Sequence, residues 1–388
     1  MKIAIEGQRL FRRNKHGMDM VALELIRNLQ KIDTENEYYI FVKPGPDSNC
    51  LQPTANFHII PLSGGPYPIW EQFALPAAVK KAGCHMLHCT SNTAPIFSSI
   101  PLIVTIHDII YLESLAFIWK SGTWYQKFGN IYRRFVVRRL IKGCRKIITV
   151  SEFEKRRMEA FFGLQDDDRL VAVYNGVSKH FRKMEDEKAL SEIGFKYSLP
   201  EKYFFFLGNT DPKKNTPNTL KSYAIYRRKS GNNIPLVMLD FDRGRLRKML
   251  DEIQEPDLIN HIHLAGYVPN IELPAIYNMC EIFLYPSLRE SFGIPILEAM
   301  ACGVPVITSN TSSMPEVSGN AAILINPGNP EEIADAMIKL QKDPVLRNKL
   351  INDGFARAQQ FSWENMAKQV QSLYYQVHEK NGNLLIFA

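Results

Sequence analysis

The stretch Tyr285–Pro305 constrains the fold of this chain more than any other. An apolar run that leads into it, Ile282–Tyr285, predicts a buried strand. Gly293 lies in the loop that follows, where it can adopt backbone angles that other residues avoid. Pro295 suits the first turn of a helix, because its missing N–H would have no partner there, and Gly303 can end that helix. The stretch therefore predicts a strand, a glycine loop and a helix.

A glycine loop between a strand and a helix favours a bound phosphate, since backbone N–H groups and the helix dipole both attract an anion. Two carboxylates flank this loop, Glu290 within it and Glu298 in the predicted helix. An ionised carboxylate only accepts hydrogen bonds, which suits the hydroxyls of a sugar or a ribose. The spacing alone is also compatible with a helix cap and a solvated helix face.

The Glu-x7-Glu spacing within Glu-Ser-Phe-Gly-Ile-Pro-Ile-Leu-Glu-Ala-Met-Ala-Cys-Gly-Val-Pro-Val resembles glycosyltransferase family 4, whose members are retaining enzymes of the GT-B fold. The resemblance implies that Glu290 and the loop backbone hold the donor sugar and that Glu298 holds the nucleotide ribose. The loop residues concerned are Ser291, Phe292, Gly293 and Ile294. The family more often has glycine at the position of Ser291, a departure that bears on the choice of sugar.

A second strand, glycine and helix pattern begins at Tyr203 and contains two adjacent lysines, Lys213 and Lys214. The resembling family has basic residues here against the donor diphosphate, and Lys214 aligns with the most characteristic of them. One subgroup has arginine at the position of Lys213, so that a bidentate fork is replaced by a point charge. The alternative is a solvated lysine pair without a ligand.

The resemblance implies further contacts at four positions. His107 follows a predicted strand, Leu102–Ile106, and matches a histidine that touches the donor sugar. Gly17 would allow the close approach of a loop to the donor phosphates and the acceptor, and the backbone at Tyr267 and Val268 would read the base. Instead, His107 could be satisfied by a neighbouring carbonyl group, and Gly17 could be a plain turn residue.

The length of 388 residues and the 45% hydrophobic content are sufficient for two domains with their own cores. With the resemblance, we expect an α/β protein of GT-B architecture, in which two Rossmann-like doubly wound domains face an inter-domain cleft. The expected boundaries are an N-terminal acceptor-side domain at 1–180, a linker at 181–200 and a C-terminal nucleotide-sugar-binding domain at 201–362. The final segment, 363–388, is expected to be a helix that crosses back to the N-terminal domain.

The composition also bears on localisation. No apolar run approaches the roughly 20 residues that a membrane helix needs, and the chain enters its first predicted strand, Lys2–Glu6, without a signal-peptide pattern. Six scattered cysteines in a chain of this size indicate free thiols. We therefore expect a cytoplasmic protein, placed at the inner face of the membrane if the segment described next binds lipid.

Residues 119–146 alternate aromatic and basic side chains without a single acidic one. Helices of this composition can lie on anionic membrane surfaces, so the segment predicts peripheral membrane contact. The alternative is an ordinary helix with one solvated face, since part of it must pack against its domain. The formal net charge of +7 also permits nucleic acid, but no known nucleic-acid-binding motif accompanies it, and we expect no such partner.

Two patterns suggest metal ligands, and we expect neither to bind a metal. Asp240 and Asp242 form the Asp-x-Asp motif of the other large glycosyltransferase fold, GT-A, but enzymes of that fold lack the Glu290–Glu298 stretch. Cys84–Cys89 contains two histidines and two cysteines, but on a strand each same-face pair would be about 13 Å apart.

The resemblance thus implies a retaining transfer of a hexose from a GDP- or UDP-sugar to a glycan or lipid-linked acceptor, in cell-surface polysaccharide synthesis. Mannose from GDP-mannose is the leading donor, since it is common in the resembling family. Glu290, His107 and Lys214 are the expected catalytic residues, with no metal or other cofactor. The alternatives are a non-catalytic nucleotide-sugar-binding protein and a nucleotide-sugar epimerase of the same fold.

Overall fold

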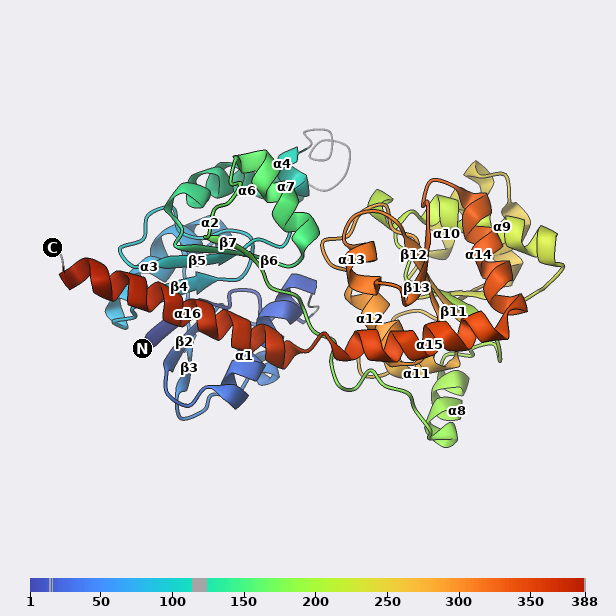
Figure 1. Cartoon of the computed structure of the whole chain (residues 1–388), viewed down its shortest axis with the longest axis horizontal. Helices are drawn as coiled ribbons and strands as arrows, with labels where there is room; N and C mark the ends of the chain where they lie inside the picture. Colours follow the sequence, from blue (N-terminus) through green and yellow to red (C-terminus); the bar gives the residue numbers. More distant parts are fainter. Residues whose placement is uncertain (14, 16, 114–123, 387–388) are drawn as a thin grey trace. The chain divides into compact units, whose positions relative to one another are not determined.

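The computed structural model describes residues 1–13, 15, 17–113 and 124–386, and the side chains of these except 124–127 and 381–386. The basic and aromatic segment 119–146 therefore lies partly outside the described residues. The chain divides into two compact units (Figure 1). Unit 1 contains Met1–Asn175 and Trp363–Ala388, and unit 2 contains Gly176–Ser362.

Unit 1 is built around a seven-stranded parallel sheet of order β3-β2-β1-β4-β5-β6-β7. Its strands are β1 Lys2–Glu6, β2 Glu37–Val42, β3 Phe57–Pro61, β4 Met86–Cys89, β5 Leu102–Thr105, β6 Lys146–Thr149 and β7 Leu170–Ala172. Its helices are α1 Gly17–Ile32, α2 Tyr67–Ile69, α3 Leu75–Lys81, α4 Ile110–Glu113, α6 Trp124–Gly143, α7 Glu152–Phe162 and α16 Trp363–Ile386, with a 3-10 turn η1 at Ser48–Cys50. The central strands are buried on both faces, which explains their continuous apolar runs.

Unit 2 contains a six-stranded parallel sheet of order β10-β9-β8-β11-β12-β13. Its strands are β8 Phe204–Phe206, β9 Leu236–Met238, β10 Ile262–Leu264, β11 Ile282–Tyr285, β12 Val306–Ser309 and β13 Ala322–Ile325. Its helices are α8 Glu187–Lys196, α9 Thr216–Ser230, α10 Arg243–Glu252, α11 Leu273–Met279, α12 Ile294–Ala301, α13 Met314–Ser318, α14 Pro330–Lys342 and α15 Pro344–Gln359, with 3-10 turns η3 Pro212–Lys214 and η4 Pro256–His261.

The strand order reverses between neighbouring strands in both sheets, at β1/β4 in unit 1 and at β8/β11 in unit 2. Doubly wound sheets bind ligands outside the carboxyl ends of their strands at such a switch point. The loops that leave β8 and β11 carry Lys214 and Glu290 respectively, so the topology of unit 2 places both at this point.

Helix α16 belongs to unit 1, although it is the last helix of the described chain. It packs beside α1 (Figure 1). The Tyr374 hydroxyl lies 2.7 Å from Nδ1 of the buried His88, and Asn36 donates to the Tyr375 hydroxyl at 2.9 Å. Burial lowers the pKa of His88 to about 3, so its ring is neutral at physiological pH.

The segment predicted as a linker, 181–200, carries a helix and groups with unit 2. Asp186 caps α8, and the hydroxyl of Tyr197 donates to Glu272. The exposed face of α8 is strongly charged, which hides the helical spacing of its few apolar residues in the sequence. The chain instead passes from unit 1 to unit 2 at Asn175 and returns at Ser362.

The helical segment 67–81 is irregular, because a π-helical turn, η2, at Trp70–Ala74 separates α2 from α3. Pro76 lies in the first turn of α3, where its missing N–H needs no partner. The π turn carries the buried Glu71, whose carboxylate accepts hydrogen bonds from Tyr67, Thr93 and Tyr132. Such turns occur where a side chain needs a position that a regular helix does not offer.

The six cysteines are free thiols, as predicted. Among the described residues, no helix combines the length and the apolar character that crossing a bilayer requires.

Candidate active site

Lys214 and Glu290 form an ion pair at the switch point of unit 2. The Lys214 Nζ lies 2.7 Å from Oε1 of Glu290 and 3.1 Å from the hydroxyl of Tyr285, the last residue of β11. The ammonium group also lies 4.8 Å from the centre of the Tyr285 ring. The two charged side chains are only 16% and 11% exposed. A predicted anion-binding residue and a predicted sugar-binding residue are therefore in direct contact.

Lys213 takes a different position from its neighbour. Its Nζ lies 3.8 Å from Asp211, whose carboxylate also accepts from the backbone N–H of Lys213 and begins the short turn η3. The Lys213 carbonyl accepts from the N–H of Leu288 at 2.7 Å, which ties this turn to the loop that carries Glu290. Lys213 is more exposed than Lys214, and its distance to the nearest carboxylate is longer.

Ser312 and Ser313, which the sequence pattern did not single out, form hydrogen bonds with the backbone of the loop that carries Glu290. The Ser312 hydroxyl accepts from the N–H of Glu290 at 3.1 Å and donates to the carbonyl of Glu290 at 2.6 Å. The Ser313 hydroxyl lies within hydrogen-bond distance of the carbonyls of Glu290 and Phe292. Ser312 has φ +61°, a left-handed conformation that is uncommon outside glycine. The loop between β12 and α13 thus holds the backbone at Glu290.

Asn215 supports the same loop and was also missed from the sequence. It follows Lys214 in a left-handed conformation, φ +60°. Its buried amide donates to the carbonyls of Pro286 and Pro327, at 2.9 and 2.7 Å. Its residue type offered one signal, because asparagine tolerates the left-handed region better than most residues.

The glycine loop enters α12 as predicted. Gly293 has φ +102°, and Pro295 lies in the first turn of the helix. Phe292 is buried against Phe361, with ring centres 5.8 Å apart, while Ser291 and Ile294 are half-buried. The loop backbone is therefore anchored by one buried side chain. In the first turn of α12, Pro295 has no N–H, and the N–H of Ile296 donates to the carbonyl of Gly293 at 3.0 Å.

Glu298 lies one turn into α12, and its carboxylate accepts a hydrogen bond of 3.1 Å from the Tyr277 hydroxyl. Burial raises the pKa of Glu298 to about 7, because the charged form loses hydration there. A carboxylate can accept hydrogen bonds from several donors, so Glu298 has acceptor capacity in addition to its bond with Tyr277.

Tyr267 and Val268 follow Gly266, which has φ +72°. The Tyr267 side chain is 68% exposed, whereas Val268 is buried. The Gly266 carbonyl accepts from the N–H of Asp240 at 2.8 Å, so the loops after β9 and β10 are joined. Backbone groups of this loop are thus held in a fixed position beside an exposed aromatic ring.

The Asp-x-Asp pair has structural partners in unit 2. Asp242 caps α10 by accepting from the N–H of Arg245 at 2.8 Å, and Asp240 takes a left-handed conformation in the preceding turn. Within the ranges that the structure describes, no group of three or more His, Cys, Asp or Glu side chains is arranged to hold a metal ion.

The remaining predicted residues, His107 and Gly17, lie in unit 1. His107 is buried, with Nε2 3.0 Å from the carbonyl of Thr90, and burial lowers its pKa. A carbonyl only accepts, so the neutral ring carries its proton on Nε2 and Nδ1 is the acceptor. Gly17 begins α1, and a Cβ placed on it would meet no atom within 4 Å.

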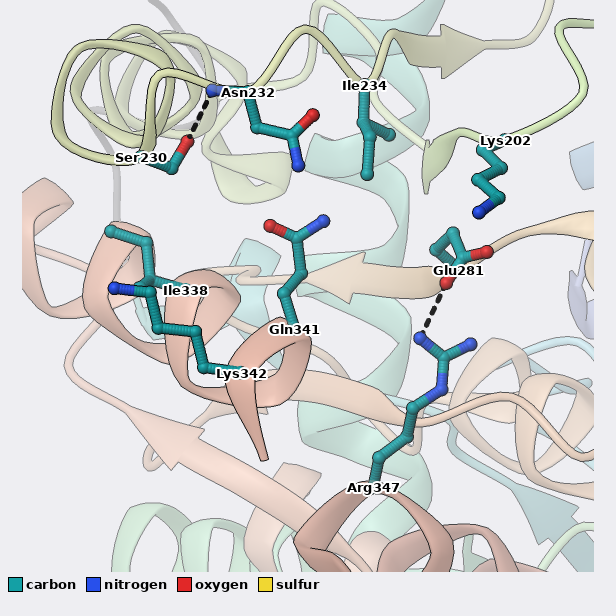
Figure 2. A pocket seen from close by; sticks show the side chains of 9 residues that line it. All are labelled: Lys202, Ser230, Asn232, Ile234, Glu281, Ile338, Gln341, Lys342 and Arg347. Atoms are coloured by element: carbon teal, nitrogen blue, oxygen red, sulfur yellow. Dashed lines mark hydrogen bonds and ion pairs between the residues drawn. The ribbon is translucent and has the colours of Figure 1, made fainter. Parts of the chain in front are cut away.

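Unit 2 also has a cavity of about 350 Å³, at the end of its sheet that is opposite to Lys214 and Glu290 (Figure 2). Its lining includes Lys202 and Glu281, which precede β8 and β11, so it lies at the amino ends of the strands. The Glu281 carboxylate pairs with Arg347 at 2.6 Å, and the amides of Asn232 and Gln341 point into it. It is therefore separate from the predicted donor residues.

Two family models match the chain. The model described as glycosyl transferases group 1 matches residues 192–357, and the model described as glycosyltransferase family 4 matches residues 16–181. Each covers most of one unit, and together they cover most of the sequence. The chain belongs to the group 1, family 4 glycosyltransferases.

The chain is similar to O-antigen chain mannosyltransferase B of Escherichia coli, with 29% identity over 273 residues, 70% of this chain and 69% of that protein. It is 26% identical to O-antigen chain mannosyltransferase RfbU of Salmonella typhimurium over 307 residues, 78% of this chain and 76% of the relative. A match to the serotype-specific mannosyltransferase WbdA of Escherichia coli, at 29% identity, spans 52% of this chain and only 25% of WbdA.

Solved structures share the fold. Sucrose-phosphate synthase from Thermosynechococcus elongatus superposes with a TM-score of 0.73 at 19% identity, covering 98% of this chain and 99% of that one. HepE from Anabaena, solved in complex with UDP, gives a TM-score of 0.72 at 16% identity, with 97% and 100% coverage. The predicted fold class, GT-B with two Rossmann-like domains, is confirmed.

Proposed function

We propose that this glycosyltransferase moves a hexose from a nucleotide sugar to a glycan or lipid-linked acceptor, with retention of anomeric configuration, in cell-surface polysaccharide synthesis. The Lys214–Glu290 pair at the switch point of unit 2 carries the proposal. It combines a cation for a diphosphate with an acceptor for sugar hydroxyls, beside the start of α12. The position of the pair at the carboxyl ends of the strands, where doubly wound sheets bind ligands, favours a binding role over a purely structural one.

The chemistry follows from where charge develops. Cleavage of the bond between the sugar and the diphosphate leaves negative charge on the diphosphate and an oxocarbenium-like sugar. Lys213, Lys214 and the N–H groups at the start of α12 stabilise the negative charge. The carboxylate of Glu290 accepts hydrogen bonds from sugar hydroxyls and orients the ring. The acceptor attacks from the face that the diphosphate leaves, and a phosphate oxygen accepts its proton, so no protein base is needed.

The tautomer of His107 determines which hydrogen bond its ring can make to the donor sugar. With its proton donated to the Thr90 carbonyl, the neutral ring offers Nδ1 as a hydrogen-bond acceptor. We assign it a contact with a hydroxyl of the donor sugar. The lowered pKa of His107 keeps the ring in this neutral form at physiological pH.

The proposed reaction requires no metal. Lysines and helix N–H groups supply the positive charge, and Asp242 is engaged as the cap of α10. For the donor, the names of the E. coli and Salmonella relatives favour mannose, and we propose GDP-mannose. The nucleotide contacts are assigned to Glu298 for the ribose and to the backbone at Tyr267 and Val268 for the base.

The described part of the 119–146 segment supports a membrane-proximal acceptor. Phe128, Ile131 and Phe135 are 61%, 51% and 52% exposed and share one face of α6. The same helix contains no acidic residue, and Arg139 and Lys142 continue the exposed face. We propose that this face contacts an anionic membrane surface, at the inner face of the membrane.

Nucleotide release from a panel of UDP-, GDP- and ADP-sugars, with and without EDTA, tests the proposal. Slow hydrolysis of GDP-mannose that EDTA leaves unchanged would support it, and NMR of the released sugar or product reports the anomeric configuration. Loss of release with EDTA would contradict the metal-free mechanism.

The Glu290→Gln variant distinguishes an enzyme from a protein that binds nucleotide sugars without catalysis. A parent that turns over a donor, with a variant that binds the donor but turns over slowly, supports an enzyme. A parent that binds nucleotide sugars and shows no turnover with any donor or acceptor would instead indicate a binding protein. Conversion of the donor sugar into another nucleotide-linked sugar would indicate the epimerase.

A further inference from the structure

A cavity of about 710 Å³ lies in unit 1 at the amino ends of the strands. His107 lies at the other end of the strands, after β5. Its lining includes His85, Leu102 and Arg145, which stand at the starts of β4, β5 and β6. His107 follows the carboxyl end of β5, where doubly wound sheets bind their substrates. The cavity therefore lies outside the proposed transfer site, and its volume is within the range of about 300–1,000 Å³ that is usual for ligand pockets.

The interior of the cavity is largely apolar. The residues that form it come from the loop before β5 and from the end of α6, namely Ile96, Ile100, Pro101, Leu102 and Leu140. Ile96 and Ile100 pack against the core of unit 1, so the walls are held in place by the fold. A rigid apolar cavity of this size suits a hydrocarbon chain rather than a sugar.

The rim of the cavity is basic. Arg139 and Arg145 line it and supply its positive charge. The rings of His85 and His378 lie 5.8 Å apart beside them, and burial lowers the pKa of His85. Among the described residues that line the cavity, none is acidic. Arginine presents a planar fork of donors that matches the oxygens of a phosphate. The positive charge of the rim therefore favours a ligand that joins an anionic head group to an apolar chain.

The cavity adjoins the last turns of α6, from which Arg139, Leu140 and Gly143 line it. Arg139 lies one turn after Phe135, with its guanidinium carbon 3.5 Å from the centre of the Phe135 ring. Phe97 stands between two lining residues, Ile96 and Ser98, and is 87% exposed. Exposed aromatic side chains beside a basic rim are the arrangement that a bilayer surface accommodates.

We propose that this cavity binds one anionic phospholipid of the membrane, with an acyl chain in the apolar interior and the phosphate between Arg139 and Arg145. The proposal rests on the membrane contact of α6 proposed above and adds a defined lipid site to it. The occupant is a lipid that holds the protein at the surface, not the acceptor, because the cavity lies at the edge of the sheet away from His107.

The first test uses the full chain and a short-chain lipid below its micelle concentration, dioctanoyl phosphatidylglycerol, in a calorimetric titration. We expect one site, weaker binding of dioctanoyl phosphatidylcholine by about tenfold or more, and no binding of glycerol phosphate. The Arg139→Gln/Arg145→Gln double variant should bind about tenfold to a few hundredfold more weakly, as expected for the loss of charge-assisted hydrogen bonds.

A second variant fills the cavity without changing its charge. Gly143 lines the cavity, and a Cβ placed there meets no atom within 4 Å, so Gly143→Leu should fold and block the interior. Gly129→Leu is the matched control, since Gly129 also lies on α6 with open space around it but does not line the cavity. We expect one-site lipid binding to disappear in Gly143→Leu and to persist in Gly129→Leu, with similar melting temperatures.

Unchanged lipid binding in Gly143→Leu, equal affinity for the zwitterionic lipid, or binding of glycerol phosphate alone would overturn the lipid site. Two separate measurements test the proposed function itself: donor hydrolysis, and sedimentation with vesicles of phosphatidylcholine with and without phosphatidylglycerol. A chain that binds the monomeric lipid but does not sediment with either kind of vesicle would refute the membrane contact and, with it, the proposal that this lipid holds the protein at the surface.

Discussion

The contact between Lys214 and Glu290 keeps both charges ready before a donor arrives. Each is largely withdrawn from water, and a charge in such a position is stable only when it is paired. The pair also keeps the two side chains from adopting other rotamers. In the proposed reaction, the donor brings a negative diphosphate for Lys214 and hydroxyls for Glu290, so it replaces interactions that are already aligned. The site therefore needs little reorganisation on binding.

Replacing Lys214 by Met should slow transfer by about tenfold to a few hundredfold, because one charge-assisted hydrogen bond to the leaving diphosphate contributes about 1.5–3 kcal/mol. The measurement is kcat/KM with saturating acceptor. Lys221→Met, an exposed lysine on α9, is the control and should be unchanged. Wild-type rates in Lys214→Met would contradict the assigned role.

The affinity for nucleoside diphosphate should fall as the pH drops from 8 to 6, because Glu298 has a pKa of about 7 and its protonated form has lost acceptor capacity. The decrease attributable to this group is at most about tenfold per pH unit below that pKa. The phosphate of the ligand titrates in the same range, so the comparison is with Glu298→Gln. The variant should show a flatter profile, and an identical profile would refute the role of Glu298.

At this scale the sequence singled out the charged residues of the candidate site, but not the residues that position their loops. Glu290, Glu298 and Lys214 stand in motifs whose residue types carry the chemistry. Ser312 and Asn215 act through backbone groups of distant loops, and their left-handed conformations leave almost no trace in residue type. The contact of Lys214 with Glu290 could be inferred only once the strand order was known.

Among the elements, α16 stabilises unit 1, because its side chains form hydrogen bonds with polar groups of the sheet and of the segment before β2. His88 in β4 is buried and neutral, and both ring nitrogens are paired, Nδ1 with Tyr374 and Nε2 with Thr105. Tyr374 also packs near Tyr38, with ring centres 6.4 Å apart. Loss of this helix would leave several buried polar atoms without partners.

Replacing Tyr374 by Phe should destabilise unit 1 by about 1–3 kcal/mol, since Nδ1 of His88 would lose its partner in a buried position. Urea unfolding followed by probes in each unit measures this, and only the transition of unit 1 should shift. Tyr375→Phe on the same helix, with a less buried hydroxyl, should cost less. Equal shifts in both variants would argue against a special role of His88.

Elements with a continuous apolar run were predicted closely, as in β1 and β11, because a buried parallel strand leaves little freedom in its sequence. The cap of α7 has a local cause that a sequence can carry, since the Ser151 hydroxyl accepts from the N–H of Glu154 at 3.2 Å. Helix α8 and the π turn η2 were not predicted. Both depend on partners that are distant in the sequence, Glu272 for α8 and Tyr132 for the π turn.

At the scale of the whole molecule, the two units differ in how the chain builds them. Unit 2 is one continuous segment, Gly176–Ser362, with its own sheet and core, whereas unit 1 combines two separated segments. Unit 2 holds every donor-binding residue predicted from the sequence except Gly17 and His107, and the loops that carry its candidate residues are its own. Recognition of the nucleotide should therefore be a property of this segment alone.

A protein made of residues 176–362 should fold, bind a nucleoside diphosphate and catalyse no transfer, because His107 and the acceptor side lie in the other segment. Circular dichroism and calorimetry with GDP and UDP measure this. The same fragment with Glu298→Gln should bind more weakly. A fragment that stays unfolded, or that folds and ignores both nucleotides, would show that unit 2 is not self-sufficient.

The division of unit 1 between two segments also sets an order of events during protein synthesis. The ribosome releases residues 1–175 and all of unit 2 before α16 emerges. At about 5–20 residues per second, the roughly 200 residues in between take about 10–40 s to synthesise. During this interval the nascent surface around His88 and Tyr38 lacks its cover and is available to chaperones. Unit 2 is thus the first to be finished, and unit 1 waits for the last helix.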